Sequence, residues 1–248
     1  MDWGRAKTIL ILSFFLLNMV LGYQLWTTRS DLLEFDANTA SAAEEIQKLI
    51  KSKNIQISTE IPKDVPKLKE IVVNFDDKYT SNQLIPLETP FKYSPLLSRS
   101  GARETAPKTG IPNMDKYQYD PILSTNGTYV FHQLYGSLPM FEVRLELKEQ
   151  DGMIVGYRQG YAEVKPESDQ KEQKVISPYM VLRSLIENYF PSGTVVTSIK
   201  LGYHGQVFNS QTMFMVPYWR VTIGNGEDDI YYVHALNGAV DPPQRNKR

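Results

Sequence analysis

The sequence predicts an α+β fold: a single N-terminal transmembrane helix followed by two related modules, each a helix packed on an antiparallel β-sheet. Three observations predict it. An uncharged apolar run opens the chain, two stretches with helical periodicity each precede a series of alternating strands, and one strand motif occurs in both series.

The opening run from Thr8 to Thr28 contains 21 residues without a charge. At about 1.5 Å per residue it is roughly 31 Å long as a helix, enough to cross a bilayer. A cleaved signal peptide would have a shorter apolar core followed by a small-x-small site, whereas this run ends in the bulky segment 23–26. We therefore expect an uncleaved single-pass anchor in the cell membrane. Because Arg5 and Lys7 precede the run, we expect residues 1–7 to be cytoplasmic and the remainder of the chain to be extracytoplasmic.

One face of this helix carries polar and small residues. An amide in the middle of a bilayer costs free energy unless a partner supplies hydrogen bonds, and small residues let a second helix approach closely. We therefore predict a transmembrane interaction face. The alternative is that the Asn18 amide bonds back to its own helix. At helical spacing the face comprises Ile11, Phe15, Asn18, Gly22 and Leu25.

The outer part is expected to divide into a first module, 29–168, and a second module, 169–248. In the first, 31–53 has an apolar helical stripe, and 78–123 is a proline-rich extended excursion with short strand pieces, expected to be mobile over 98–114. Alternating strands begin at Thr128, and the segment 150–152 (Gln-Asp-Gly) is typical of a hairpin turn.

The second module begins with a helix in "ISPYMVLRSLIENYF", after the polar linker 165–174. Ser177 is a plausible N-cap and Pro178 suits the first helical position. The predicted buried face consists of Met180, Leu182, Leu185, Ile186 and Tyr189. Strands follow, and "VPYWRVTI" (216–223) aligns with "LPMFEVRL" (138–145), which indicates an internal repeat; chance convergence of two strands is the alternative.

Composition and motifs argue against several functions. The net charge is −1 without a basic stripe, so nucleic acid is not an expected partner. The absence of cysteine excludes disulfides, a thiol nucleophile and cysteine metal ligands. The adjacent carboxylates at 44–45, 76–77 and 227–229 are expected on the solvated surface. The histidines His132, His204 and His234 lack metal-ligand spacing and are expected to be packed or surface residues.

We therefore expect no catalytic residues, no metal, no cofactor and no enzymatic activity. Tyrosines exceed what one core face needs, which suggests a protein interface. The tyrosines concerned are Tyr157, Tyr161, Tyr203, Tyr231 and Tyr232.

The chain resembles the YycI (WalI) family. The resemblance is carried by "MDWGRAKTILILSFFLLNMVLGYQLW", by "VPKLKEIVVNF" and by the closing "PYWRVTIGNGEDDIYYVHALNGAVD". The closing segment is also similar to a PepSY-type module through "W-x-V" and "Y-V-x-A-x-x-G". The polar stretch 98–114 departs from the family pattern in length.

This resemblance implies a regulator of the sensor histidine kinase YycG (WalK), which controls cell-wall metabolism in low-GC Gram-positive bacteria. It implies the similar protein YycH (WalH) as a second partner, and an α+β outer part that resembles two YycH domains. One rival is a PepSY-like ligand-sensing or inhibitory module on an inert membrane tether. A second rival, a cell-wall enzyme, would need a catalytic group that the sequence does not assemble.

Overall fold

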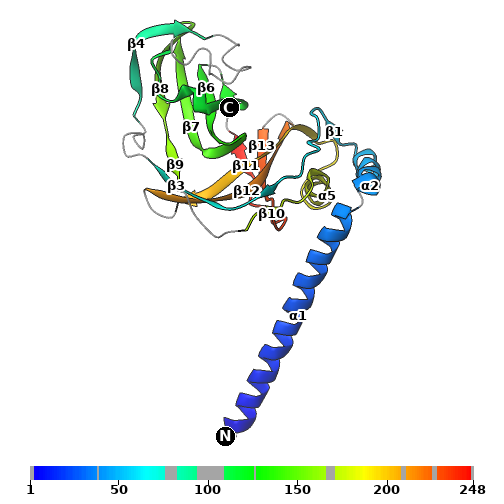
Figure 1. Ribbon diagram of the computed structural model, residues 1–248. Helices are drawn as coiled ribbons and strands as arrows, with labels where there is room; N and C mark the ends of the chain where they lie inside the picture. Colours follow the sequence, from blue (N-terminus) through cyan, green and yellow to red (C-terminus); the bar gives the residue numbers. More distant parts are fainter. Residues whose placement is uncertain are drawn as a thin grey trace.

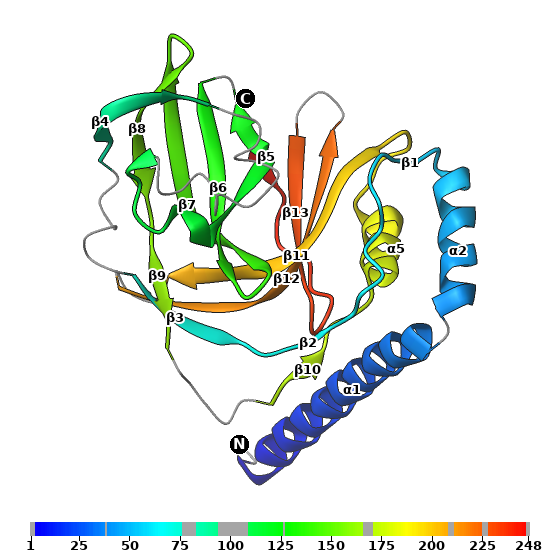
Figure 2. The ribbon, with the colours of Figure 1, turned by 45° about the horizontal axis from the view of Figure 1, so that its top comes forward.

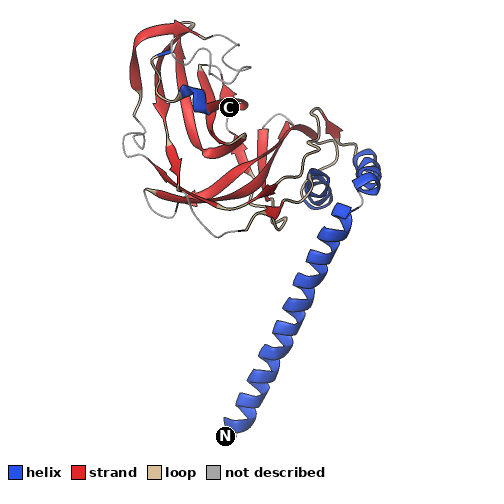
Figure 3. Cartoon of the chain, viewed as in Figure 1, coloured by secondary structure: helices blue, strands red, loops and turns tan. Residues whose placement is uncertain are grey.

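The computed structural model describes residues 3–37, 39–75, 83–93, 109–125, 127–165, 171–207, 211–224 and 228–246. A long helix projects from a sheet-rich body, with two shorter helices on one side of that body (Figures 1 and 3). The α+β class is therefore confirmed. Most of the stretch expected to be mobile, 98–108, lies outside the described residues.

The helices are α1 (Trp3–Ala37), α2 (Thr39–Ser52), α5 (Pro178–Asn188) and the 3₁₀ turn η2 (Met114–Lys116). The strands of the first half are β1 (Gln56–Ile57), β2 (Lys67–Leu68), β3 (Ile71–Phe75), β4 (Ile85–Lys92), β5 (Tyr117–Thr125), β6 (Thr128–Tyr135), β7 (Leu138–Gln150), β8 (Met153–Gln159) and β9 (Ala162–Val164). Those of the second half are β10 (Gln173–Lys174), β11 (Val195–Val207), β12 (Thr212–Gly224), β13 (Asp228–His234) and β14 (Gln244–Asn246).

Helix α1 contains one candidate membrane span, Lys7–Gln24, none of which is buried against the rest of the described chain. It continues to Ala37, so the helix expected over 31–53 is divided between the end of α1 and α2. The physical reason is packing. Helix α2 runs in a different direction from α1 (Figure 2), and in this direction Ile46 packs into the core of the body. The C-terminal part of α1 contacts both α2 and α5.

Two antiparallel meanders form the body. The N-terminal meander is β5–β8 and the C-terminal meander is β11–β14. They join where β7 runs parallel to β11, with Met140 opposite Tyr203. Gly202 makes this approach possible, since a Cβ there would lie 2.5 Å from the carbonyl oxygen of Pro139. The result is one 12-stranded sheet among the described residues.

Short strands of the first half complete this sheet. β1 pairs in parallel with β11, β3 pairs antiparallel with β12 and β9, and β4 pairs with β8. Within the expected excursion 78–123 the structure therefore contains β4, η2 and most of β5. β2 and β10 form a separate two-stranded ladder.

The largest core lies between the C-terminal meander and both amphipathic helices. Ile46 of α2 and Leu185 of α5 pack with Trp219 of β12, whose indole N–H donates to the carbonyl oxygen of Ile176 at 3.0 Å. The helix expected to cover the first module therefore packs on the second, which corrects that part of the prediction. The apolar stripe of α2 contacts α5, and Ile46 on this stripe enters the core of the C-terminal meander.

The N-terminal meander has its own core, which is built from strands and η2 in the described part of the chain. It contains Phe131, Leu145 and Ile154, with Tyr129 and Tyr93 packed against it. The boundary at 168/169 stays a prediction, and the large core crosses it because 46–57 pack with the second half.

Local signals in the sequence are confirmed. Asp151 and Gly152 have φ of 54° and 77°, the positive values that a two-residue hairpin turn requires. The Ser177 hydroxyl accepts from the Met180 amide at 3.4 Å and caps α5. On the buried face, however, Val181 takes the place expected for Met180, and Tyr189 is 44% exposed.

The surplus tyrosines do not lie at a free surface. All five, Tyr157, Tyr161, Tyr203, Tyr231 and Tyr232, are buried in the body. The interface expectation was wrong because these rings fill separate cores. Tyr157 and Tyr161 lie in the core of the N-terminal meander, and Tyr231 lies in the helix-backed core. Tyr203 and Tyr232 lie in two smaller clusters with residues of both meanders. The aligned strands of the proposed repeat, β7 and β12, hold the same place in their meanders, each in the interior between antiparallel neighbours. The repeat and the two-module division stay a prediction.

Candidate functional site

The predicted interaction face lies on the part of α1 that the body does not cover. Ile11 and Phe15 are 58% and 63% exposed, and nothing lies within 4 Å of a Cβ built on Gly22. The backbone of Leu25 continues the same helix, and its side chain lies outside the described residues. As an interaction face this set stays a prediction.

Asn18 bonds within its own helix, as the alternative interpretation held. Its Nδ2 donates to the carbonyl oxygen of Phe14 at 2.8 Å. This bond uses one of the two amide N–H groups. The amide thus keeps one donor and the Oδ1 acceptor for a neighbouring helix, so the bond and the predicted association are compatible.

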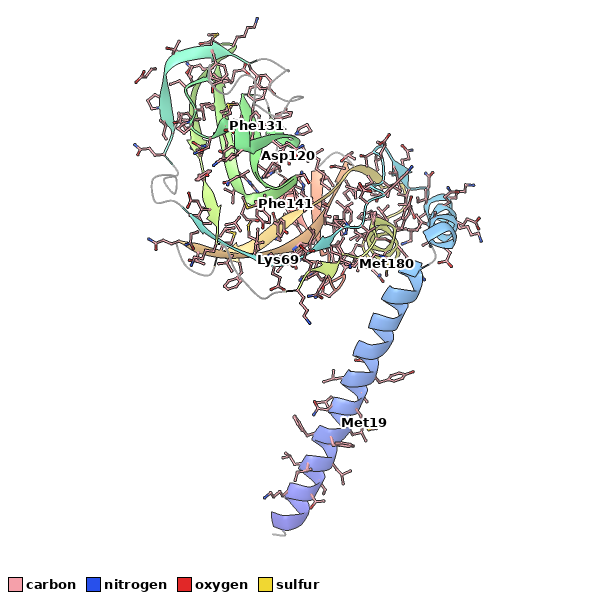
Figure 4. All side chains as sticks on the ribbon, viewed as in Figure 1. Met19, Lys69, Asp120, Phe131, Phe141 and Met180 are labelled. Carbon is pink, nitrogen blue, oxygen red and sulfur yellow. The ribbon has the colours of Figure 1, made fainter. Side chains whose placement is uncertain are left out.

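A buried ion cluster joins the two meanders. It consists of Asp120 on β5, His132 on β6 and Arg220 on β12, each no more than 2% exposed. His132 Nε2 lies 2.9 Å from Asp120 Oδ2, and Arg220 Nη2 donates to the same oxygen. Figure 4 shows Asp120 near Phe141, the ring over which the Arg220 guanidinium lies at 4.6 Å. The cluster therefore holds strands of both meanders together.

The cluster has one negative and one positive charge with a neutral imidazole. Burial raises the pKa of Asp120, but the hydrogen bond from His132 and the charge of Arg220 outweigh it and hold that pKa well below its usual range. Burial, with a smaller contribution from the charge of Arg220, lowers the pKa of His132 to about 4 against the opposing hydrogen bond and charge of Asp120. His132 is therefore neutral at pH 7 and donates from Nε2 to the carboxylate.

A second cation lies close to this cluster. Lys200 of β11 is the cross-strand partner of Arg220, and burial lowers its pKa, partly opposed by the charge of Asp120. In the described chain, His132 Nδ1 and Arg220 Nε are buried without a hydrogen-bond partner. Removing the Asp120 carboxylate would leave two cations facing each other in a low-dielectric interior.

The other histidines also have protein partners. His204 Nδ1 bonds to Glu142 and its ring stacks on Tyr232 at 4.1 Å, while His234 Nδ1 accepts from the Leu236 amide at 3.2 Å. Burial lowers the pKa of His234. All three histidines are packed, as expected. Within the described ranges there is no group of three side chains able to hold a metal ion.

The adjacent carboxylates do not converge on a site. Glu45 of the 44–45 pair is exposed on α2 and forms an ion pair with Arg183 of α5 at 3.5 Å. The pair at 76–77 and Glu227 lie outside the described residues. Asp228 and Asp229 begin β13, and Asp229 Oδ1 is buried without a hydrogen-bond partner among the described residues, so the solvated-surface expectation is wrong for Asp229.

The ion cluster was missed from the sequence. Asp120 lies in the stretch interpreted as a proline-rich excursion, so its place on β5 was not expected. A signal was present, since Arg220 is the one charge within "VPYWRVTI", where a buried strand has no solvated side for it.

The comparisons with known proteins decide the family. The model described as "YycI protein" matches residues 34–236, most of the chain. The chain belongs to the YycI family. No curated protein matches the sequence at a significant level.

Two solved structures are similar in part. An uncharacterized protein from Eubacterium rectale has 14% identity and a TM-score of 0.38, with 85% of this chain and 84% of that chain covered. The Bacillus megaterium YpeB C-terminal domain has 11% identity and a TM-score of 0.41, with 83% and 97% covered. Because both TM-scores are below 0.5, neither similarity informs the function.

Membership of the YycI family associates the chain with the YycG (WalK) two-component system and with signal transduction. The apolar helix Lys7–Gln24 is consistent with a membrane-anchored member of the family.

Proposed function

We propose that this chain is a non-enzymatic regulator of the sensor histidine kinase YycG (WalK) and acts in a membrane complex with YycH (WalH). The helix face of Ile11, Phe15, Asn18, Gly22 and Leu25 contacts the membrane helices of these partners, and the body contacts their extracytoplasmic parts. The tail 1–7 is cytoplasmic and the body is extracytoplasmic. Family membership supports the proposal.

One structural observation carries the role of the helix. The span Lys7–Gln24 has no covering contact from the described body, and its polar residue Asn18 still has an amide donor and acceptor to offer. Polar and small residues on one stripe are typical of helices that associate in membranes. Confinement to the membrane raises the effective concentration of the partners, so weak contacts suffice.

Regulation requires more than binding. A bound protein shifts the kinase between its signalling states only when it binds one state more tightly than the other. The proposed complex therefore has unequal affinity for the two states, and this difference sets the size of the change in kinase output.

The test moves the amide around the helix without changing the composition of the span. Asn18→Leu combined with Leu16→Asn moves the amide to the opposite face of α1 and keeps the mean hydropathy of the span, and Leu16→Asn alone is the matched control. We expect the double variant to co-purify several-fold less kinase and YycH and to change a kinase-dependent reporter. The single variant should retain both.

Replacing 8–28 with poly-leucine extends the test to the whole span. Unchanged co-purification and unchanged reporter output would show that the face has no role. If an anchor-free body also regulated fully, the alternative of a ligand-sensing or inhibitory module on an inert tether would replace this proposal.

A further inference from the structure

A cavity lies at the end of the N-terminal meander, where the end of β5, the start of β6 and the C-terminal end of β7 meet. Its volume is about 400 Å³, within the roughly 300–1,000 Å³ typical of small-molecule sites. Most of its lining is polar. The lining residues are Tyr119, Ser124, Thr125, Gly127, Tyr129 and Glu149.

One wall of the cavity is a bulge in β5 held by Asp120. The pairing of β5 with β6 shifts register between Asp120 and Thr125. Within the bulge, Asp120 Oδ1 accepts from the Ile122 amide at 3.0 Å, and the Ser124 hydroxyl donates to the Asp120 carbonyl oxygen at 2.7 Å. The same carboxylate binds Arg220, so the ion cluster fixes the wall of the cavity.

The opposite wall presents a carboxylate and aromatic rings. The Tyr129 hydroxyl donates to Glu149 Oε2, and this bond raises the pKa of Tyr129 to about 12, so the phenol stays protonated. Tyr93 stacks on Tyr129 with ring centroids 3.7 Å apart and fixes its orientation. In the described chain no ring stacks parallel on Tyr119.

These groups select a ligand by charge. The lining includes one carboxylate and no cation, which disfavours anionic ligands. Lys148 Nζ lies 3.9 Å from a Cβ built on Gly127, close to the rim, and this positive charge disfavours a cationic ligand. A neutral ligand with several hydroxyl groups matches what remains, because the carboxylate accepts hydroxyl protons and Thr125 both donates and accepts. The Ser124 hydroxyl donates to Asp120 and accepts from the Val130 amide, so it offers a ligand one remaining lone pair.

We propose that this cavity is a carbohydrate-binding site for a neutral sugar or short oligosaccharide. The sugar hydroxyls donate to Glu149 and bond to Thr125, and the C–H face of the sugar ring lies on Tyr119, whose ring face is electronegative. This inference does not depend on the proposed kinase regulation, because it concerns a ligand of the body and can hold without any partner protein.

The test measures binding of chitotriose and maltotriose to the full chain in nanodiscs by calorimetry and by shifts in protein NMR signals. We expect saturable binding of at least one sugar at micromolar to millimolar concentration. Glu149→Gln should weaken it about tenfold, as expected for loss of a charge-assisted hydrogen bond. Glu146→Gln is the matched control, since Glu146 lies on the same strand and pairs with Arg158 at 3.6 Å.

Tyr119→Ala provides a second variant that leaves the Tyr129–Glu149 pair in place, and it should also weaken binding. Thermal unfolding of each variant checks that the body is folded. The proposal is overturned if neither sugar binds, if Glu149→Gln and Glu146→Gln bind equally well, or if tetramethylammonium binds more tightly than both sugars. The last result would identify a cation site.

Discussion

The two meanders share a strand pattern but bury it in different ways. Each contains a 13-residue strand between antiparallel neighbours, β7 in one and β12 in the other. The C-terminal meander is covered by α2 and α5 around Trp219, whereas the N-terminal meander packs on rings supplied by its own strands and on η2. The two strands thus hold the same place in their meanders, and the elements that cover them differ, so only the C-terminal meander forms the helix-backed core among the described residues.

This difference separates two roles within one body. Helices α2 and α5, from the two halves of the chain, concentrate apolar burial on the C-terminal meander, next to α1. The N-terminal meander has no α-helix over its core in the described chain, and the cavity lies at its strand ends. The ion cluster of Asp120, His132 and Arg220 and the parallel contact of β7 with β11 are among the contacts that join the two.

The largest effect is expected from breaking the ion cluster. Arg220→Met leaves Asp120 ionised and buried without its partner, and loss of one member of a buried pair costs about 3–5 kcal/mol of unfolding free energy. Urea unfolding measures it. Arg158→Met is the control, because Arg158 is half exposed and its ion pair should contribute less than about 1 kcal/mol. Equal losses in the two variants would mean that the cluster does not join the meanders.

The packing of α2 is the second point of comparison. Ile46→Ala should reduce the unfolding free energy by about 2–4 kcal/mol, because Ile46 is 1% exposed within the core of the C-terminal meander. Ile85→Ala on β4, where the side chain is 37% exposed, should cost far less. A small effect of Ile46→Ala in urea unfolding would contradict the assignment of α2 to this core.

Acid should weaken the junction through His132. Its pKa is about 4 in the folded chain and about 6.5 when unfolded, so between these values the unfolded state binds the extra proton. The unfolding free energy should therefore be highest above pH 6.5 and should fall by about 2–3 kcal/mol by pH 4.5. The lowered pKa of Asp120 adds a further loss below about pH 4.

Unfolding in urea across this pH range measures the effect. In His132→Gln the slope between pH 6.5 and 4.5 should be smaller than in the unchanged protein. An identical slope in both would assign the acid sensitivity to other groups.

The smallest expected effect concerns the parallel contact. In Gly202→Ala the new methyl group would meet the Pro139 carbonyl oxygen at 2.5 Å and the Phe141 ring at 2.6 Å, which should cost about 1–3 kcal/mol. Gly160→Ala is matched to it, because its nearest contact would be an ordinary 3.5 Å. If thermal unfolding ranked the two variants in the opposite order, β7 and β11 would not approach as closely as described.

Much of the fold follows from local signals. Alternation predicted β6, β7 and β8, and the Ser177 cap and the turn at Asp151 and Gly152 lie where the sequence indicates. These features depend on neighbours in the chain, and periodicity and φ preference report such neighbours directly.

Pairing over long sequence distance was not predictable in the same way. The contact of α2 with α5, the addition of β1 and β3 to the C-terminal meander and the meeting of Asp120 with Arg220 each depend on where other segments lie. For the candidate face on α1, the sequence supplied the stripe and also the intrahelical bond of Asn18, because an i to i−4 bond is local.

Helix α1 has a consequence for geometry at the cell surface. Beyond Gln24 it continues to Ala37, which at about 1.5 Å per residue adds roughly 20 Å of helix above the candidate span. With the span in a bilayer, this segment acts as a lever arm. In the proposed complex, a neighbouring helix that tilted or rotated the span by a small angle would swing the body through an arc. A lateral contact inside the lipid would then change which side of the sheet faces the kinase.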